Sequence, residues 1–375
     1  MLKVGITGQS GFIGKHLFNF LNLKKDKIIM VPFLDSYFEN QDKLKKFVID
    51  CDAIVHLAAM NRHGDPQVIY DTNLKLVKQL TEAMEVTDSR PHVLFSSSTQ
   101  EERDNIYGKS KQDGRMLLKQ WAERNQSRFT GFVIPNVFGP FGNPFYNSVI
   151  ATFCHQLIQN EQPKIVIDAN LQLIYVNELV DLFYQKMIDP VTGSDEDNYK
   201  VQYTSENKVS EILLKLENYK KIYFEGHSFP ELNSMFEVNL FNTFRSYMDH
   251  SSRYPVLLKK NPDQRGVFIE TIKTSLGGQF SFSTTIPGIT RGNHFHTRKI
   301  ERFIVIRGKA IIELRRIGAT EILHFELNGE QPSFVDMPVW YSHNITNVGN
   351  EELITLFWIN EFFNPNDPDT YFEKV

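Results

Sequence analysis

The sequence has few cysteines, no long apolar run and no excess of charge of either sign. Only two cysteines, Cys51 and Cys154, occur in 375 residues, which excludes a disulfide framework and favours a reducing compartment. No apolar stretch reaches the roughly 18 residues that a membrane-spanning helix needs. The formal net charge of -4 gives no electrostatic reason to expect a nucleic acid or an anionic membrane as a partner. We therefore expect a cytoplasmic protein whose first residues form a strand and not a secretion signal.

The chain is too long for one typical hydrophobic core, and its predicted secondary structure changes along its length. Two domains are the expectation for 375 residues. Apolar β runs such as Phe129–Ile134 and Ile165–Ile167 alternate with helical patterns in the first part, which predicts a Rossmann-like, doubly wound parallel sheet. From Pro255 onward, short β runs are separated by Gly and Pro, which predicts an all-β sandwich or barrel. We place the boundary near residue 245, giving domains 1–245 and 246–375; an acidic run, Asp195–Asp197, predicts a solvated loop.

A glycine-rich turn follows the first apolar run of the sequence. Leu2–Thr7 predicts a buried parallel strand, and Gly8, Gly11 and Gly14 lead from it into a helical pattern. Gly8 permits a tight turn, Gly11 lets backbone N–H groups approach a pyrophosphate, and Gly14 lets the helix and strand pack closely. The spacing is Gly-x-x-Gly-x-x-Gly and not Gly-x-Gly-x-x-Gly, but its position between strand and helix predicts dinucleotide binding.

Two further segments bear on the dinucleotide. Asp35 closely follows the second predicted strand, Ile28–Leu34, at a place where an acidic residue often holds the adenosine ribose. A solvated loop residue is an equal interpretation, and without an Arg nearby the choice between NAD and NADP stays open. The run Ala53–Ala59 predicts a buried strand that ends in small residues, where a cofactor could lie close.

A Tyr and a Lys four residues apart, Tyr107 and Lys111, begin an amphipathic helical pattern that places both on one helix face. An ammonium beside a phenol favours the phenolate, so we expect the pKa of Tyr107 to move toward neutral. Upstream, a predicted strand, Val93–Phe95, runs into Ser96–Ser98, at the sheet edge where ligands bind. An ordinary helix start and a strand-end turn could carry the same residues. The order of glycine turn, serines, Tyr and Lys is nevertheless the one a nicotinamide-dependent reductase requires.

On these motifs, residues 1 to about 240 resemble the extended short-chain dehydrogenase/reductases that act on nucleotide sugars. The shared motifs are Thr7-Gly8-x-x-Gly11-x-x-Gly14, His56-Leu57-Ala58-Ala59, Phe95-Ser96-Ser97-Ser98, Tyr107-x-x-x-Lys111 and Pro135-Asn136-Val137-Phe138-Gly139. The resemblance implies that Ser98 is the catalytic hydroxyl, that Tyr107 is the acid and that Lys111 binds the nicotinamide ribose. It implies cofactor contacts at Gly8, Gly11, Phe12, Ile13, Gly14, Asp35, Leu57, Ala58, Ala59, Tyr107 and Lys111.

The sequence departs from that family's pattern in two places. Ser98 and Tyr107 are only nine residues apart, a shorter interval than is usual in such epimerases. The Asp-Glu pair that follows this position in sugar 4,6-dehydratases is replaced by Thr99-Gln100. Without that pair, dehydration has no obvious proton donor, which favours simple ketone reduction.

The C-terminal part carries a pattern typical of a metal site. His294 and His296 are two residues apart, so a strand would place both imidazoles on one side. Glu301 follows five residues later, and His343 comes after Pro338. Three His and one Glu suit a divalent ion such as zinc, with manganese or iron as rivals. Any one of them alone would be an ordinary surface or core residue.

These intervals resemble the two cupin motifs, Gly-x5-His-x-His-x4-Glu-x6-Gly, bounded here by Gly288 and Gly308, and Pro-x-Gly-x2-His-x3-Asn, which ends at Asn347. Trp340 stands where the second motif usually has Gly, and we expect it to reshape the rim of the pocket. The resemblance implies a cupin barrel. Its metal ligands would be His294, His296, Glu301 and His343.

The two parts together resemble, over the whole length, the CapF-type bifunctional enzymes of capsular polysaccharide biosynthesis. This resemblance implies a UDP-linked 4-keto-6-deoxy-N-acetylhexosamine substrate. The cupin would epimerise carbon 3, and the reductase would use NADPH to reduce the ketone at carbon 4. The product would be UDP-2-acetamido-2,6-dideoxy-L-talose, on the path to UDP-N-acetyl-L-fucosamine. A homodimer formed through the cupin is also implied.

Some points stay open at this stage. NAD(H) is an alternative to NADP(H), because Ser10 and Pro32-Phe33 stand where similar proteins carry basic residues. The epimerase base has no clear candidate. We expect Tyr341 to be an aromatic residue at the rim of the pocket and Lys299 to be exposed to solvent. Competing functions are a non-catalytic dinucleotide sensor that binds sugar, a reductase whose cupin serves only dimerisation, and a metal-dependent oxygenase. An intact Tyr107 and Lys111 argue against the sensor, and oxygenases more often use two His and one carboxylate.

Overall fold

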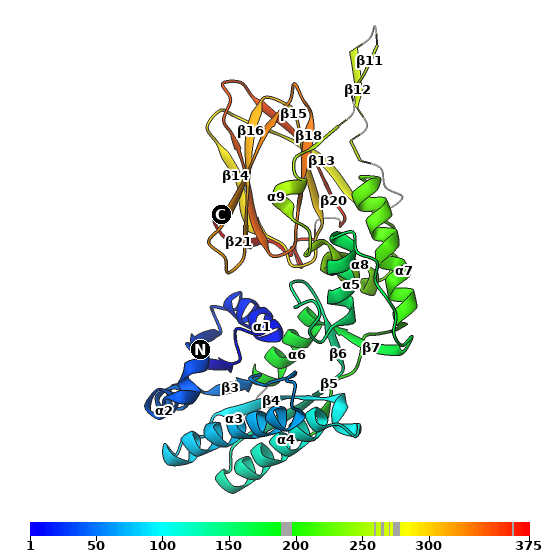
Figure 1. The fold of residues 1–375 in the computed structure, drawn as a ribbon. Helices are drawn as coiled ribbons and strands as arrows, with labels where there is room; N and C mark the ends of the chain where they lie inside the picture. The colour runs from blue at the N-terminus through cyan, green and yellow to red at the C-terminus, as the bar shows by residue number, and fades with distance from the viewer. Residues whose placement is uncertain (189–196, 259, 264–265, 270, 273–277, 362–363) are drawn as a thin grey trace. The chain divides into compact units, whose positions relative to one another are not determined.

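The computed structural model describes residues 1–188, 197–258, 260–263, 266–269, 271–272, 278–361 and 364–375. The chain divides into two compact units (Figure 1). Unit 1 comprises residues 1–152 and 167–209, and unit 2 comprises residues 153–166 and 210–375. In this division residues 210–245 belong with the C-terminal strands, while a functional boundary near residue 245 remains a prediction. Asp195 and Glu196 of the acidic run lie outside the described residues.

Unit 1 is built on a six-stranded sheet in which every described pairing is parallel. The order is β2-β1-β3-β4-β5-β8. The strands are β1 (Leu2–Thr7), β2 (Ile28–Val31), β3 (Ala53–His56), β4 (His92–Ser98), β5 (Phe129–Ile134) and β8 (Tyr199–Lys200). The strand order reverses between β1 and β3, and in such sheets ligands bind beyond the carboxyl ends of the strands at this point. The predicted parallel, Rossmann-like sheet is confirmed.

Helices cover both faces of this sheet, because successive residues point to opposite faces and are buried on both, as in β3 and β5. On one face, α1 (Phe12–Asn22) and α6 (Val176–Ile188) bury residues such as Leu17 and Phe183. On the other, α2 (Gln41–Asp50), α3 (Pro66–Val86) and α4 (Ile106–Asn125) bury Trp121 and its neighbours. The remaining elements of unit 1 are η1 (Asp35–Glu39), η2 (Thr99–Glu102) and a small sheet of β6 (Asn136–Phe138), β7 (Asn170–Tyr175) and β9 (Ser205–Lys208). Helix α5 (Val149–Ile158) begins in unit 1, and most of it belongs to unit 2.

Two predicted strands differ from the structure. The second strand ends at Val31 and not at Leu34, since Pro32 has no N–H group for the ladder. Ile165–Ile167 forms no strand, and Val166 and Ile167 are 93% and 74% exposed. Apolar character alone therefore predicted a buried strand where the chain runs along the surface.

Unit 2 contains two five-stranded antiparallel sheets (Figure 1). Their orders are β10-β18-β15-β20-β13 and β17-β16-β19-β14-β21. The strands are β10 (Val256–Leu257), β13 (Gln279–Thr285), β14 (Thr290–Phe295), β15 (Glu301–Arg307), β16 (Lys309–Arg316), β17 (Ile322–Asn328), β18 (Ser333–Met337), β19 (Tyr341–Asn347), β20 (Leu353–Ile359) and β21 (Tyr371–Phe372); β11 (Lys260–Asp263) and β12 (Gly266–Ile269) form a separate hairpin. The antiparallel β region is confirmed. No strand pairing in the described ranges joins the two sheets, so a closed cupin barrel remains a prediction.

The helical segments between residues 209 and 253 are α7 (Val209–Tyr219), η3 (Lys220–Glu225), α8 (Met235–Arg245) and α9 (His250–Arg253). Of these, η3 and α8 contact β18 through Tyr223 and Arg245. The side chains of Arg302 and Asp336, on neighbouring strands, form an ion pair of 2.8 Å and are 1% and 0% exposed. The Tyr223 hydroxyl, from η3, donates a hydrogen bond to the same carboxylate. This buried contact holds η3 against β18, and Arg302 follows Glu301 directly in the chain. Within the described residues, every helix is too short or too polar to cross a lipid bilayer.

Candidate dinucleotide and metal sites

The glycine turn packs against the end of β3 with no room for side chains. Gly8 has a φ of +70°, and a Cβ there would lie 2.7 Å from the backbone nitrogen of Ala58. A Cβ on Gly14 would lie 2.3 Å from the carbonyl oxygen of Gly8. The Leu57 N–H also donates to the Thr7 carbonyl over 3.1 Å. The turn is therefore held at the switch point between β1 and β3, as the motif predicts.

The start of α1 offers backbone N–H groups to an anion. Gly11 is the N-cap residue of α1 and supplies no side-chain cap, and Phe12 and Ile13 are the first helical residues. A Cβ on Gly11 would contact only the Gly8 carbonyl, at 3.2 Å. Unpaired N–H groups and the helix dipole at such an end favour a pyrophosphate. The residues present therefore fit a dinucleotide, and Leu57, Ala58 and Ala59 follow β3 beside them.

Asp35 lies next to the glycine turn. It is the first residue of η1, and its Oδ2 accepts a hydrogen bond of 3.0 Å from the Ser10 hydroxyl. The contact is exposed to solvent, and both interpretations of Asp35, as a ribose-binding carboxylate and as a solvated loop residue, stay predictions. A carboxylate here can accept hydrogen bonds from ribose hydroxyls and repels a phosphate on the same ring.

Tyr107 and Lys111 lie on the first turns of α4. The helix begins at Ile106, because the Asn105 side chain accepts a hydrogen bond of 2.7 Å from the Gly108 N–H. Lys111 is buried, and its Nζ donates to the Ser96 carbonyl over 2.8 Å. The same Nζ lies 5.9 Å from the centre of the Tyr107 ring. The structure thus brings the end of β4 and the Tyr-Lys pair together.

A close backbone contact explains how Ser98 and Tyr107 can be so near in sequence. Ser98 ends β4, and its Oγ accepts a hydrogen bond of 3.2 Å from the Gln100 N–H. The intervening residues fold into η2, and a Cβ on Gly108 would lie 1.9 Å from the Gln100 carbonyl oxygen. Only Gly at position 108 allows α4 to lie directly against η2.

The sequence interpretation missed one charged pair beneath this site. Glu101 and Arg115 form an ion pair of 2.7 Å with almost fully buried side chains, and the Ser97 hydroxyl donates to Glu101. Fourteen residues separate the pair, so no local pattern marks it. Because the Glu101 carboxylate is engaged by Arg115, it supports the joint between β4 and α4 and does not replace the missing dehydratase acid.

The expected lowering of the Tyr107 pKa is wrong. Burial raises the pKa of Tyr107, and Tyr146 acts in the same direction. Burial also lowers the pKa of Lys111 to about 8, although Glu101 opposes this change. Burial disfavours the charged form of both groups, and the Lys111 ammonium is directed to a backbone carbonyl. Tyr107 is therefore a phenol at neutral pH, which suits a proton donor.

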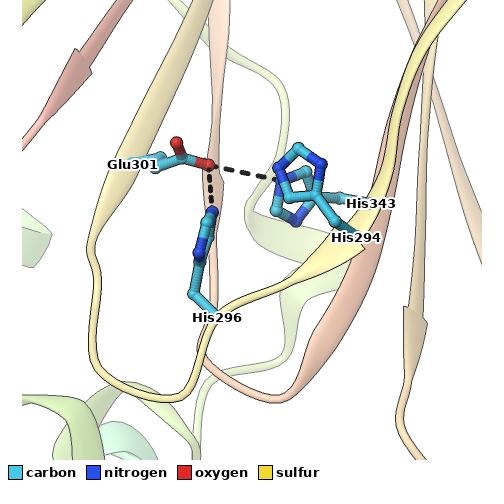
Figure 2. A group of neighbouring side chains, drawn as sticks. All are labelled: His294, His296, Glu301 and His343. Carbon is cyan, nitrogen blue, oxygen red and sulfur yellow. Dashed lines mark ion pairs between the residues drawn. The ribbon is translucent and has the colours of Figure 1, made fainter. Parts of the chain in front are cut away.

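The predicted metal ligands converge in unit 2 (Figure 2). His294 lies on β14 and His343 on β19 in one sheet, whereas Glu301 begins β15 in the other. His296 lies in the connection between β14 and β15, because β14 ends at Phe295. One ligand atom from each of the four residues lies within 4.8 Å of all the others. The spacing therefore identified a cluster that the fold assembles from both sheets.

The ligand atoms of this cluster lack other partners. Glu301 Oε2 lies 3.1 Å from His296 Nε2 and 3.3 Å from His343 Nε2 (Figure 2). None of these three buried atoms makes a well-aligned hydrogen bond, and the rings of His294 and His343 are 4.6 Å apart. Buried polar atoms without hydrogen bonds are costly. A divalent cation would satisfy all of them, so the donor set fits a metal ion.

Electrostatics favour the metal-binding form of two of these residues, His294 and Glu301. Burial, reinforced by the other two histidines, lowers the pKa of His294 to about 4. Burial opposes ionisation of Glu301, but His296 and His343 hold its pKa well below the usual range. Burial likewise opposes protonation of His296, yet the Glu301 carboxylate raises its pKa. A neutral imidazole and an ionised carboxylate are the forms that bind metal.

Trp340 differs from the expectation of a rim residue. It is 2% exposed and stacks on Phe295, with ring centres 5.5 Å apart. Its φ of +60° is the left-handed conformation that Gly adopts without strain, and its N–H donates to the His296 carbonyl over 2.8 Å. Trp340 thus keeps the turn that the cupin motif assigns to Gly, and it packs against Phe295, between the proposed ligands His294 and His296 in the chain.

Comparison with known families identifies both parts of the chain. Residues 4–201 match the family model described as "NAD dependent epimerase/dehydratase family". The chain belongs to this family. Residues 261–371 match the model described as "Polysaccharide biosynthesis C-terminal domain". The predicted enzyme class, with a nicotinamide dinucleotide as cofactor, is thereby confirmed at the level of the family.

Two known proteins are similar to this chain over its full length. It is 33% identical to the UDP-2-acetamido-2,6-beta-L-arabino-hexul-4-ose reductase of Pseudomonas aeruginosa, over 99% of this chain and 98% of that one. The crystal structure of the capsular polysaccharide assembling protein CapF from Staphylococcus aureus is 34% identical, with a TM-score of 0.62, and covers 100% of both chains. The predicted CapF-type architecture is therefore confirmed. A structure of RMD from Pseudomonas aeruginosa complexed with NADPH, 19% identical with a TM-score of 0.55, covers 66% of this chain and 99% of that one and shows the shared fold.

Proposed function

We propose that the chain is a bifunctional nucleotide-sugar enzyme of capsule or O-antigen precursor synthesis. Unit 1 would reduce the ketone at carbon 4 of a UDP-4-keto-6-deoxy-N-acetylhexosamine, after the cupin-like unit 2 has epimerised carbon 3. The product would be UDP-2-acetamido-2,6-dideoxy-L-talose. The observation that carries this proposal is the buried Lys111, which ties Tyr107 to the end of β4 in a chain similar over its whole length to a hexulose reductase.

The side chains of unit 1 supply the proton for ketone reduction. Bound NAD(P)H supplies the hydride. Tyr107, a phenol at neutral pH because of its burial, gives its proton to the ketone oxygen as carbon 4 is reduced, so that an alcohol forms. Ser98, at the end of β4, donates a hydrogen bond to the same oxygen. Lys111 holds the nicotinamide ribose. Reduction removes the carbonyl that acidifies carbon 3 and so preserves the new configuration.

Unit 2 would bind a divalent transition-metal ion, with zinc expected, through His294, His296, Glu301 and His343. Bound there, the ion supplies Lewis-acid stabilisation of the enolate. Support comes from the unpartnered ligand atoms of the cluster.

The two residues considered for the epimerase base are both unsuited to it. Lys299, which was expected to be solvated, is buried, and its Nζ donates to the Pro368 carbonyl over 2.5 Å. Burial also raises the pKa of Tyr341. Neither residue is therefore proposed as the epimerase base.

The nicotinamide preference and the oligomeric state belong to the proposal as well. The resemblance to CapF-type enzymes supports NADPH and a homodimer formed through the cupin region. The exposed Asp35 carboxylate beside Ser10 disfavours a 2′-phosphate, so NADH is to be assayed in parallel. A comparison of the two nicotinamides decides between these opposing indications.

The experiment offers purified protein freshly made UDP-4-keto-6-deoxy-HexNAc with NADPH or NADH. We expect nicotinamide oxidation by the intact chain and its loss in Tyr107→Phe, because the variant keeps the ring and lacks the proton. Proton exchange at carbon 3, followed in deuterated water without nicotinamide, is expected to persist in Tyr107→Phe and to vanish in His294→Ala. No oxidation with either nicotinamide would overturn the reductase assignment. Exchange that survives in His294→Ala would overturn the metal-dependent epimerase assignment.

A further inference from the structure

The end of the chain lies against the metal ligands of unit 2. We call residues 367–375 the C-terminal strap. Its strand β21 pairs antiparallel with β14, with His294 opposite Phe372 and Phe295 opposite Tyr371. Beyond β21, the Glu373 N–H donates to the Asn293 carbonyl over 2.9 Å. The strap therefore adds an edge strand beside the strand that carries the first proposed ligand.

One residue of the strap, Asp369, is built into the connection between His296 and Glu301. Asp369 is 2% exposed and has a φ of +39°. Its carboxylate accepts hydrogen bonds from the backbone N–H groups of Thr297, Arg298 and Lys299, over 3.1, 3.0 and 3.1 Å, and from the Thr297 hydroxyl, over 2.7 Å. Hydrogen bonds to an ionised acceptor are stronger than neutral ones. Asp369 thus determines the path of the segment that joins two proposed ligands.

The backbone of Asp369 contacts a ligand directly. His296 Nδ1 lies 2.5 Å from the Asp369 carbonyl oxygen. A carbonyl only accepts hydrogen bonds, so Nδ1 carries the proton and Nε2 is free to bind a metal. The same Nε2 is the atom that lies 3.1 Å from Glu301 Oε2. This contact selects the tautomer of His296 that the cluster requires.

Further contacts fasten the strap on both sides of the cluster. Lys299 Nζ donates to the Pro368 carbonyl over 2.5 Å. The neighbouring ion pair between Arg298 and Asp367 is exposed to solvent and contributes little to this attachment. On the other side, the Ser342 hydroxyl, adjacent to His343 in the chain, donates to the Glu373 carbonyl, and Arg315 pairs with Glu373 over 3.0 Å. The strap therefore pairs with His294, contacts His296 itself, and contacts residues close in the chain to Glu301 and His343.

We propose that the C-terminal strap is a positioning element of the metal site. Asp369 acts through His296: its carbonyl selects the Nδ1–H tautomer, and its carboxylate holds the connection to Glu301, so that the four ligands converge only when the strap is docked. Asp369 is a positioning residue and not a ligand. The proposal deepens the proposed function, since it rests on the metal site in unit 2.

The test compares Asp369→Ala and Asp369→Asn with Asp367→Ala in the full-length chain. Asp367→Ala is the matched control, because it removes an exposed carboxylate from the same strap. Zinc affinity is measured by competition with a chromophoric chelator, and Co²⁺ is titrated for its visible spectrum. We expect Asp369→Ala to weaken zinc binding about 10- to 100-fold, Asp369→Asn to weaken it less, and Asp367→Ala to change it by less than about threefold. Equal zinc affinity in Asp369→Ala and the intact chain would overturn the proposal.

A second measurement needs no metal and no activity. Long-range ¹H–¹⁵N spectra of the metal-free intact chain at alkaline pH report the tautomer of each histidine. We expect His296 in the Nδ1–H form, and a mixture of tautomers in Asp369→Ala at unchanged circular dichroism. An Nε2–H tautomer of His296 in the intact chain would overturn the strap proposal, whether or not the site binds a metal. An intact chain that shows the expected tautomer but binds neither zinc nor Co²⁺ would overturn the proposed metal site, and with it the positioning role of the strap.

Discussion

Lys111 destabilises the fold by its own burial, so its replacement by Met is expected to stabilise unit 1. Burial lowers the pKa of Lys111 from 10.5 to about 8, which corresponds to an unfavourable contribution of about 3 kcal/mol while the group is charged. Met keeps most of the apolar stem but leaves the Ser96 carbonyl without a partner, at a cost of about 1–2 kcal/mol. We expect Lys111→Met to raise the free energy of unfolding by about 1–2 kcal/mol at pH 7 and to abolish nicotinamide oxidation.

The lowered pKa of Lys111 also predicts how the free energy of unfolding changes with pH. Because the pKa of Lys111 is lower in the folded than in the unfolded protein, the unfolded chain binds more protons between about pH 8 and pH 10.5. The stability of the intact protein therefore rises with pH across this window. The advantage of Lys111→Met is full below about pH 8 and falls away as the pH approaches 10.5.

The assay is urea unfolding followed by tryptophan fluorescence at pH 7 and at pH 9.5. Trp121 lies on α4, whereas Trp340 and Trp358 lie in unit 2, so a background with both of these replaced by Phe reports on unit 1. Lys109→Met is the control, since Lys109 is an exposed neighbour on the same helix and its loss should change stability by less than about 0.5 kcal/mol. A Lys111→Met protein that is less stable at pH 7, or whose difference from the intact protein is independent of pH, would refute the reasoning.

Three other substitutions test separate parts of the molecule. Gly14→Ala places a Cβ 2.3 Å from the Gly8 carbonyl oxygen, so the affinity for NADPH in a fluorescence titration should fall tenfold or more; an unchanged Kd would contradict the packing argument. Asp35→Asn removes the carboxylate beside Ser10, so the kcat/KM ratio of NADPH over NADH should rise several-fold, and an unchanged ratio would place Asp35 outside the ribose site. Asp336→Asn leaves a buried guanidinium without its counter-ion, so unfolding of unit 2 should become easier by about 3–5 kcal/mol, and a loss below about 1 kcal/mol in a urea titration would contradict it.

The sequence predicted those features that depend on short-range periodicity and glycine spacing. The turn Gly8–Gly14 and the helix that begins before Tyr107 follow from local backbone requirements, which a single segment reveals. The cluster of His294, His296, Glu301 and His343 could be predicted because two short motifs place metal-binding side chains at fixed intervals, although His296 lies just beyond β14 and not on the strand that alternation assumed. That prediction rested on the residue types and their spacing in the sequence, and not on the fold of unit 2.

The features that the sequence did not reveal depend on burial and on distant contacts. The pKa of Tyr107 was expected to fall because Lys111 lies four residues away, but burial of both groups outweighs their attraction. The Glu101–Arg115 pair has no local signature, and Asp369 contacts Thr297 across 72 positions of the chain. Such contacts depend on tertiary packing, which periodicity does not encode.

The most direct test of the bifunctional account is the isotope content of the product formed in deuterated water. The intact chain converts UDP-4-keto-6-deoxy-HexNAc with unlabelled NADPH, or with NADH if that nicotinamide is preferred, and the sugar is analysed by NMR. The account predicts deuterium at carbon 3, because epimerisation exchanges that proton with solvent, and protium at carbon 4, because the hydride comes from the nicotinamide. Protium retained at carbon 3 would contradict epimerisation by this chain, and deuterium at carbon 4 or the absence of a reduced sugar would contradict reduction by it.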